Sequence, residues 1–294
     1  MNYRLSRIAA ICGGKFSGCD SEVRSVVTDS RSLSCELGCR PMFVAMRGAN
    51  HDSHDFIAGM QSRGVRAFLV ERGVEASSCT GECGFVQVDN AIEALQRLAA
   101  YHRAQFRGTV VGITGSNGKT VIKEWIAEEL PEGMKYYRSP KSYNSQLGVP
   151  LSVLMLEGDE ELAIFEAGIS KPGEMERLER IIRPDAVIFT SIGDAHQENF
   201  NTPEEKAEEK LNLFAHTPTI IYNAGDPLLR RLVPARYPDR QLIAVDASRC
   251  DLNGLPYPDA ASRENAAEAL TLYGVMGYDM SQVRGGLRSL QNVA

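Results

Sequence analysis

The chain has 294 residues, of which 43% are hydrophobic and 24% are charged. These shares are typical of a folded protein and exclude wholesale disorder, and the length suggests about two domains. The net charge is −6 and no block of Lys and Arg occurs, which argues against a nucleic-acid binder. No apolar run is long enough to span a membrane, and Gly13 and Gly14 follow the short run IAAIC where a signal peptide needs a longer apolar core. We therefore expect a cytoplasmic protein.

The first hundred residues alternate short apolar runs with turn-forming residues. Four segments are typical of strands that end in loops, namely RSVVTDSR, PMFVAMRG, RAFLVERG and GFVQVDN. Between Asp89 and Phe106 the apolar residues recur at helical spacing. This mixture predicts a small α/β domain over residues 1–106.

From Thr109 onward, buried strands and helices alternate regularly. The predicted strands are TVVGIT, LAIFEAG, DAVIFTSIG, TIIYNAGD and QLIAVD. Predicted helices begin near residues 119, 173, 262 and 281, and a further helix lies between DAVIFTSIG and TIIYNAGD. Continuous apolar strands separated by helices indicate a parallel sheet with helices on both faces. We place the domain boundary near Arg107, which makes residues 107–294 the second α/β domain.

Six of the seven cysteines fall in the first 83 residues. The odd number, the chain length and the missing export signal argue against a disulfide framework. The pairs Cys35/Cys39 and Cys79/Cys83 have C-x-x-x-C spacing, which leaves a zinc site open, although structural zinc sites more often use a two-residue spacing. We expect reduced thiols with structural roles.

The segment VVGITGSNGKTVIK indicates a phosphate-binding loop. A buried strand runs into a glycine-rich loop, and Lys119 and Thr120 open the following helix. The backbone N–H groups of such a loop can surround a phosphate, while the lysine reaches the β- and γ-phosphates and the hydroxyl binds Mg²⁺. Five residues separate Gly112 from Gly118, one more than the usual motif allows. The strand–loop–helix context nevertheless favours phosphate binding over a plain turn with an exposed lysine.

Two further candidates follow predicted strands. Glu166 ends LAIFEAG, and His196 follows DAVIFT. Both should therefore lie at the carboxyl edge of the sheet, where open α/β folds bind ligands. Each could help to hold a divalent ion. The alternatives are an ordinary solvated carboxylate and a histidine with satisfied hydrogen bonds in a loop.

The segment EEKAEEKLNLF, residues 204–214, is typical of a charged, mostly solvated helix face. Composition alone singles out no lysine in it.

Together, the motifs GITGSNGKT, IFEAGIS and IGDAHQENF resemble the Mur ligases, ATP-dependent amino-acid ligases of peptidoglycan synthesis, over nearly the whole chain. The segments SYNSQLGVPLSVL, VTDSR, MFVAMRG and HDSHDF are similar to the branch that joins D-Ala-D-Ala to UDP-MurNAc-tripeptide. The resemblance implies a small N-terminal substrate domain, followed by an ATPase domain with a P-loop-type parallel sheet. It also implies an acyl phosphate that forms on the tripeptide and is attacked by the amine of D-Ala-D-Ala.

The resemblance further implies site residues. ATP would contact Gly115, Ser116, Asn117, Gly118, Lys119 and Thr120, with Asn265 beside the adenine. Mg²⁺ would be held by Thr120, Glu166, His196 and a carbamylated Lys210, with Lys206 as the less favoured lysine. The catalytic residues would be Lys119, His196 and Lys210. The UDP-linked substrate would contact Asp29, Ser30, Arg31, Asp52 and His54, with Asn144 and Ser145 also facing substrate.

Two departures from the family pattern bear on activity. Mur ligases have a third, C-terminal domain, and no segment here matches it, so we expect a fragment that is inactive alone. The stretch between YNAGDP and SRENAAEAL is shorter than is typical of this branch. Together with the segment LPYPDAASRENAAEAL, it resembles the type fused to an alanine racemase, which would place a racemase domain beyond Ala294. Two alternatives stay open, namely another Mur-type or folylpolyglutamate-type amide ligase and a nucleotide-binding module without catalysis. A P-loop kinase fits less well because it leaves the N-terminal domain unexplained.

Overall fold

The computed structural model describes residues 1–32, 40–48, 52–71, 82–193, 199–250, 252 and 259–278. The chain forms two compact units. The first contains Met1–Phe106 and Pro150–Glu157, and the second contains Arg107–Val149 and Gly158–Ala294. The first unit ends at Phe106, next to the boundary that we placed near Arg107. The sequence did not predict that residues 150–157 also belong to the first unit.

The first unit is built on a five-stranded sheet. Its strands, in spatial order, are β2 (Lys15–Gly18), β7 (Gly84–Val88), β6 (Ala67–Glu71), β5 (Pro41–Val44) and β4 (Ser25–Val27). The strands β4 to β7 pair in parallel, whereas β2 pairs antiparallel with β7. These are the four strands that the sequence predicts, with β2 added at one edge.

Short helices accompany this sheet. They are α1 (Leu5–Cys12), η1 (Ser30–Ser32), η3 (Ser53–Phe56), α2 (Ile57–Ser62) and α3 (Ala91–Arg103), and a two-stranded ribbon pairs β1 (Tyr3–Arg4) with β3 (Glu22–Val23). Helix α3 confirms the helical spacing seen after Asp89. Helix α1, which we did not predict, buries Leu5, Ile8 and Cys12, the spacing of one helix face.

The second unit contains a six-stranded parallel sheet. Its strands, in spatial order, are β13 (Gln241–Val245), β12 (Thr219–Asn223), β11 (Ala186–Phe189), β8 (Thr109–Thr114), β10 (Leu162–Glu166) and β9 (Tyr136–Arg138). All neighbouring pairs are parallel. The predicted α/β fold is therefore confirmed. Strand β8 lies between β10 and β11, so the strand order changes direction at β8, and such a point is where open sheets bind ligands.

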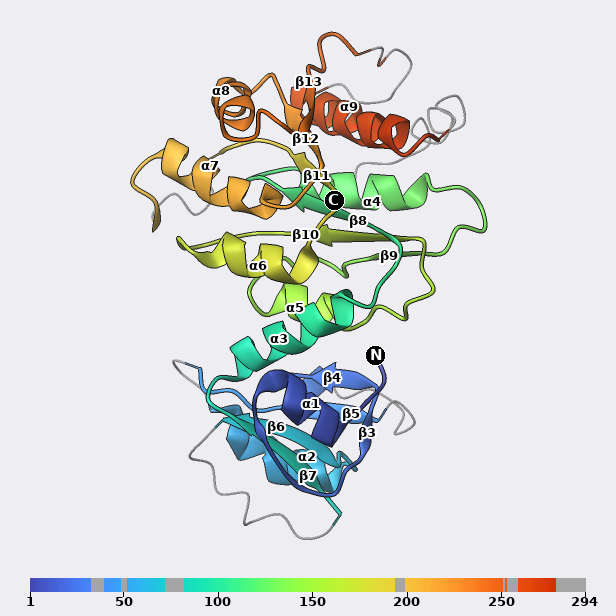
Figure 1. The fold of residues 1–294 in the computed structure, drawn as a ribbon, viewed down its shortest axis with the longest axis vertical. Helices are drawn as coiled ribbons and strands as arrows, with labels where there is room; N and C mark the ends of the chain where they lie inside the picture. The colour runs from blue at the N-terminus through green and yellow to red at the C-terminus, as the bar shows by residue number, and fades with distance from the viewer. Residues whose placement is uncertain are drawn as a thin grey trace. The chain divides into compact units, whose positions relative to one another are not determined.

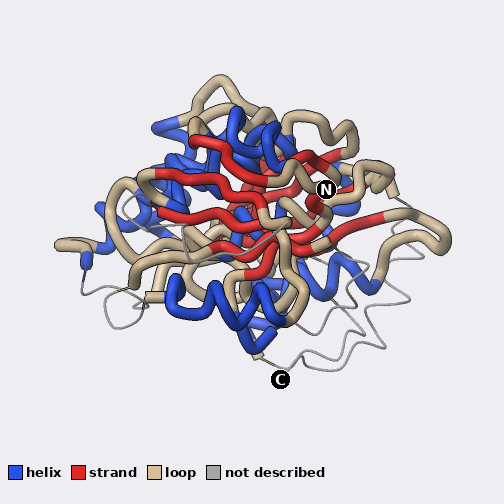
Figure 2. The backbone as a smooth tube through the Cα atoms, turned by 90° about the horizontal axis from the view of Figure 1, so that it is seen from below, coloured by secondary structure: helices blue, strands red, loops and turns tan. Residues whose placement is uncertain are grey.

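Helices cover both faces of this sheet. They are α4 (Lys119–Glu128), α5 (Gly148–Val153), α6 (Glu174–Ile182), α7 (Pro203–Leu211), η6 (Asn212–Phe214), α8 (Pro227–Arg236) and α9 (Ala260–Val275). Figure 1 shows α4 and α9 on one side of the strands and α6 and α7 on the other. Figure 2 shows the strands of both units in red and their helices in blue.

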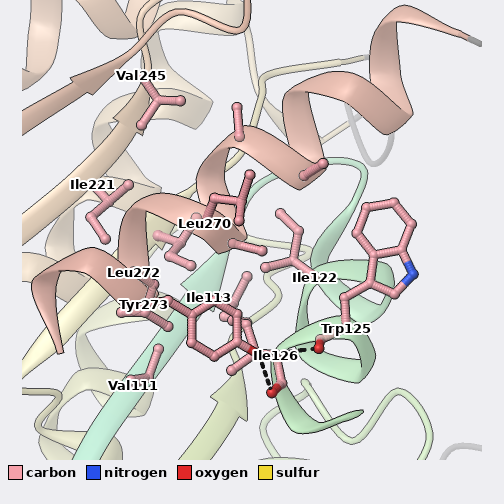
Figure 3. Packing of buried hydrophobic residues seen from close by; sticks show 14 of the residues in the cluster. Val111, Ile113, Ile122, Trp125, Ile126, Ile221, Val245, Leu270, Leu272 and Tyr273 are labelled. Atoms are coloured by element: carbon pink, nitrogen blue, oxygen red, sulfur yellow. Dashed lines mark hydrogen bonds between the residues drawn. The ribbon is translucent and has the colours of Figure 1, made fainter. Parts of the chain in front are cut away.

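A hydrophobic core of the second unit lies under α4 and α9. Alternate residues of β8, such as Val111 and Ile113, point to this face and pack against Ile122, Leu272 and Tyr273 (Figure 3). This alternation is expected because successive side chains of a strand point to opposite faces. The core therefore fixes α4, and with it the loop between β8 and α4, against the sheet.

Among the residues that the structure describes, Cys12, Cys19, Cys83 and Cys250 form no disulfide. The zinc question depends on Cys35, Cys39 and Cys79, which lie outside the described residues. Elsewhere, within the part of the chain that the structure describes, no group of three or more His, Cys, Asp or Glu side chains could hold a metal ion. No helix among those residues is long and apolar enough to cross a membrane.

Candidate functional site

The loop between β8 and α4 requires glycine at two positions. Gly115 has a φ of +143°, and a Cβ atom there would lie 1.9 Å from Thr190 Oγ1. Gly118 has a φ of +82° and immediately precedes α4. Positive φ values of this kind favour glycine because other residues meet steric strain. The glycines thus let the backbone turn tightly at the start of the helix.

The residues after β11 hold this loop in place. The backbone N–H of Ser116 donates to the carbonyl of Ser191 at 2.7 Å, and its hydroxyl donates to the carbonyl of Gly193 at 3.3 Å. Thr190 Oγ1 donates to the carbonyl of Asn117 at 2.5 Å. The shape of the loop is therefore set by the protein itself, before any ligand binds.

Two lysines converge on this loop from different helices. Lys119 Nζ donates to the carbonyls of Gly115 at 2.8 Å and Ser116 at 3.2 Å. Lys210 Nζ, from α7, donates to the same Gly115 carbonyl at 3.2 Å. Both lysines border a hollow with about 440 Å³ of empty space, open solvent included, whose other lining residues are Gly115, Ser116, Asn144, Ser145, Gly168, Ile169 and Ser170. Positive charge on these lysines makes the small hollow attractive to an anion.

Burial alters the protonation of both lysines. It lowers the pKa of Lys119, against the opposing effect of the Glu166 charge. It lowers the pKa of Lys210 to about 7, and the positive charges of Lys119 and Lys206 contribute to this shift. A buried ammonium loses hydration, so its neutral form is favoured. Lys210 is therefore an amine with a substantial neutral fraction near neutral pH.

Lys206 is also buried, but its ammonium contacts a different carbonyl from that of Lys210. Its Nζ donates to the carbonyl of Gly193, and it does not line the hollow. The prediction of a solvated face on α7 holds for Glu204 and Glu208, which are exposed, but is wrong for both lysines. The geometry thus favours Lys210 over Lys206 as the lysine of the site.

Glu166 lies beside Thr120 at the carboxyl end of β10. Its Oε2 accepts from Thr120 Oγ1 at 3.1 Å and from Asn144 Nδ2 at 3.3 Å, and its side chain is fully buried. The alternative of an ordinary solvated carboxylate is therefore wrong. A hydroxyl and a carboxylate are hard oxygen donors, and Mg²⁺ commonly uses one or two such protein groups together with phosphates. Thr120 and Glu166 fit that ion.

Sequence reasoning missed Lys123, whose ammonium lies 2.9 Å from Glu166 Oε1. The available signal was a lysine between Ile122 and Ile126, on the apolar face of α4. It also missed Ser170, which lines the hollow and belongs to the highlighted segment IFEAGIS.

The remaining predicted residues of the second unit lie as follows. The side chain of Asn265, on α9, approaches the loop so closely that a Cβ at Gly118 would lie 2.3 Å from its Oδ1. Ser145 borders the hollow, and its Oγ accepts from the N–H of Gly148 at 3.1 Å. His196 lies outside the described residues, so its role stays a prediction.

Asp29, Ser30 and Arg31 follow β4 in the first unit. Arg31 Nε and Nη2 donate to the two carboxylate oxygens of Asp29 at 3.0 and 2.8 Å, and these hydrogen bonds lower the pKa of Asp29 to about 2. The carbonyl of Ser30 accepts from Arg63. The Arg31 side chain is 89% exposed, so its guanidinium is accessible to a ligand.

Asp52 and His54 follow β5, the strand next to β4. His54 Nε2 accepts from the N–H of Glu71 at 3.2 Å, so Nδ1 bears the ring proton and donates to Asp52. The His54 side chain is only 5% exposed. Both ring nitrogens are thus used to hold the loop. His54 therefore has a structural role in this unit, and a ligand would have to displace one of these contacts to bind it.

Sheet order and loop geometry define the second unit as a P-loop-type α/β domain. A family profile for the Mur ligase middle domain matches residues 113–246, which include the loop, Glu166 and Lys210. Residues 113–246 therefore belong to the Mur ligase family as its middle domain.

Named relatives and solved structures agree with this family. The UDP-N-acetylmuramoyl-tripeptide–D-alanyl-D-alanine ligase of Bacillus subtilis is 32% identical over 211 residues, covering 71% of this chain and 45% of that protein. MurF from Acinetobacter baumannii superposes with a TM-score of 0.87 at 22% identity, over 100% of this chain and 69% of that one. MurF from Thermotoga maritima, in complex with ADP, gives a TM-score of 0.75 at 26% identity, over 92% and 67%. The chain thus spans about half the length of the Bacillus relative.

Proposed function

We propose that this chain is the substrate- and nucleotide-binding part of an ATP-dependent ligase that joins D-Ala-D-Ala to UDP-MurNAc-tripeptide. The observation that supports it most is the convergence of Lys119 and Lys210 on the Gly115 carbonyl, inside a hollow at the strand-order change. The names of the Bacillus and Acinetobacter relatives point to the same reaction. The ADP complex of the Thermotoga relative supports a nucleotide in this domain.

In the proposed reaction, the phosphates of ATP lie along residues 115–120. Lys119 leaves the Gly115 carbonyl and donates to the β- and γ-phosphates, which offsets their charge. The tripeptide carboxylate attacks the γ-phosphorus and ADP leaves, giving an acyl phosphate. The amine of D-Ala-D-Ala then attacks the acyl carbon, and the tetrahedral intermediate collapses with loss of inorganic phosphate and a proton. The protein contributes mainly positioning and charge.

Thr120 and Glu166 would hold Mg²⁺, with His196 and Lys210 as further members of the predicted set. The ion would supply charge neutralisation at the transferred phosphoryl group. Neutral Lys210 can add CO₂ through its amine nitrogen and release a proton, which gives a carbamate. The lysine that was a cation when protonated thus becomes an anion able to support a metal ion. The low pKa of its amine supports that assignment.

The first unit, residues 1–106, would bind the UDP end of the substrate, and residues 107–294 would bind ATP. Asp29, Ser30 and Arg31 are the proposed nucleotide contacts, and Asn144 and Ser145 would contact substrate from the second unit. Because ATP and UDP-linked precursors are cytoplasmic metabolites, we propose a cytoplasmic location.

A thermal-shift panel tests this function. Mg-ATP, Mg-GTP, UDP-MurNAc-tripeptide and UDP-MurNAc-dipeptide are each added to the wild-type chain and to Lys119→Ala. A ligand at about 100 times its Kd should add roughly 2.7 kcal/mol, which is a Tm rise of several degrees. We expect stabilisation by ATP and tripeptide, and loss of only the ATP effect in Lys119→Ala.

The same panel separates the alternatives. A preference for the dipeptide would indicate a different Mur-type amide ligase. ATP binding without any response to a UDP-peptide would leave a nucleotide-binding module and overturn the proposed substrate. No response to ATP would overturn the proposal as a whole.

A further inference from the structure

Lys123 is buried inside the second unit and contacts Glu166, which with Thr120 forms the proposed metal-binding pair. It follows Thr120 by one helical turn on α4, and its side chain has no exposed surface. A buried ammonium costs several kcal/mol of hydration unless oxygens surround it. A lysine in this position therefore needs a structural or functional reason, and the oxygens around it indicate which.

Four oxygens from three segments surround the Lys123 ammonium. Its Nζ donates to the carbonyls of Ser139, at 2.8 Å, and Lys141. It also lies 2.9 Å from Glu166 Oε1 and 3.2 Å from Glu124 Oε1. Lys123 thus ties α4 to the segment after β9 and to the end of β10.

Two of these contacts bear on Asn144, which lines the hollow, and on Glu166, its hydrogen-bond partner. Because Lys123 engages Oε1 of Glu166, the other oxygen, Oε2, is directed toward Thr120 and Asn144. Lys141 has a φ of +50°, an unusual value for a residue with a side chain, and its turn leads directly to Asn144. Lys123 itself does not line the hollow.

We propose that Lys123 is a positioning residue that holds Glu166 and the 139–144 segment in the arrangement that binds a nucleotide-associated divalent cation. This role rests on the proposed function of the site. Lys123 acts through the Glu166 carboxylate and touches neither metal nor nucleotide. Residues that orient metal ligands in this way typically change metal affinity about 10- to 100-fold when they are replaced.

Metal affinity and nucleotide affinity are measured separately to test this role. Electron paramagnetic resonance follows Mn²⁺ binding to the protein–ADP complex, and calorimetry follows ADP binding without divalent ions. We expect Lys123→Met to weaken Mn²⁺ binding about tenfold or more, with metal-free ADP affinity changed less than about twofold. A merely structural role would weaken both together or neither.

Glu124→Gln is the matched control. It changes the second carboxylate near the Lys123 ammonium but leaves Glu166 and its partners intact. We expect its Mn²⁺ affinity to stay within about threefold of wild type. An equal loss of Mn²⁺ affinity in Glu124→Gln and Lys123→Met would overturn the specific link to Glu166.

A double variant covers the case in which Lys123→Met does not fold. Lys123→Met/Glu166→Gln removes both charges, so it leaves no buried ion unpaired. If Lys123 acts through Glu166, the double variant binds Mn²⁺ as Glu166→Gln alone does. A further tenfold loss would show an independent role and overturn the proposal. Wild-type protein that binds no ADP would overturn the proposed function itself, whereas wild-type-like Mn²⁺ affinity in Lys123→Met would overturn only the role of Lys123.

Discussion

Gly115 occupies a backbone conformation and a space that no other residue fits. Its φ of +143° strains any side chain, and Thr190 Oγ1 already fills the position of a Cβ. The same Thr190 hydroxyl donates to the Asn117 carbonyl, so displacing it would also loosen the loop. Steric fit at one residue therefore determines the shape of the proposed phosphate site.

Gly115→Ala should be more harmful than an alanine at another positive-φ glycine. We expect a loss of about 2–4 kcal/mol in the free energy of unfolding, from backbone strain and crowding together. Gly133→Ala is the control, because Gly133 has a φ of +85° and a Cβ atom there would meet nothing within 4 Å. Gly133→Ala should lower the free energy of unfolding by only about 1 kcal/mol. Equal losses in urea unfolding would show that crowding at Thr190 does not matter.

Lys210 should make stability depend on pH. Its pKa is about 7 in the fold, against 10.5 for a free lysine side chain. Between these values the unfolded chain binds more protons, so the contribution of Lys210 to stability rises with pH across this window. In bicarbonate-free buffer, Lys210→Met should exceed the wild-type Tm by about 4 °C near pH 6.5, and the gap should narrow toward about pH 9.5. A gap independent of pH would contradict the lowered pKa.

A second experiment adds bicarbonate and tests whether Lys210 forms a carbamate. If neutral Lys210 takes up CO₂, ¹³C-labelled bicarbonate should give a carbamate NMR signal that grows as the pH rises through about 7. The signal should be absent from Lys210→Met. Lys206→Met is the control that should retain it.

A side chain of helix α9 hydrogen-bonds to the C-terminal end of α4, the helix that carries Lys119, Thr120 and Lys123. The last carbonyls of a helix have no partner within it. Tyr273 Oη donates to the carbonyl of Ile126 at 2.5 Å and lies 3.3 Å from that of Trp125 (Figure 3). This contact ties the phosphate-loop helix to the most C-terminal helix of the described chain.

Tyr273→Phe should therefore cost about 1–2 kcal/mol, because it removes the buried hydrogen bond to the Ile126 carbonyl. A thermal melt should show a Tm lower by several degrees. The matched variant is Tyr278→Phe, because the Tyr278 hydroxyl donates to Met134 Sδ, a weak acceptor. We expect almost no change there, and equal effects of the two variants would contradict the importance of the α4 carbonyls.

Elements were predictable where a regular period extended over several residues. The strand–helix alternation from β8 to β13 and helix α3 follow from such periods. Strand β9 has three residues, α5 contains Pro150, and α8 contains Pro234, so none gave a clear period.

For the site, the phosphate loop and Glu166 could be inferred from local sequence. The contacts of Lys123 and Lys206 could not, because their partner oxygens belong to residues distant in sequence.

At the scale of the whole molecule, each unit has its own sheet and its own core. We expect ADP to protect amides only in the second unit. In hydrogen exchange with mass spectrometry, peptides covering residues 115–120 and 166–170 should slow, whereas residues 52–71 should not change. UDP should slow exchange around residues 29–31 instead. Protection of residues 29–31 by ADP would contradict the proposal that the first unit binds the UDP end of the substrate and the second unit binds ATP.

The return of residues 150–157 to the first unit also affects how the chain is made. The carbonyls of Leu154 and Leu156 accept from the N-terminal amine, at 3.4 Å, and His102 Nε2, at 2.9 Å, so this segment is integral to the first unit. A ribosome releases residues in order, so the first unit cannot be completed until Glu157 has emerged. By then the phosphate loop and β9 are already outside the exit tunnel. Folding of the two units during translation is therefore interleaved, and an early pause in synthesis would leave the first unit unfinished.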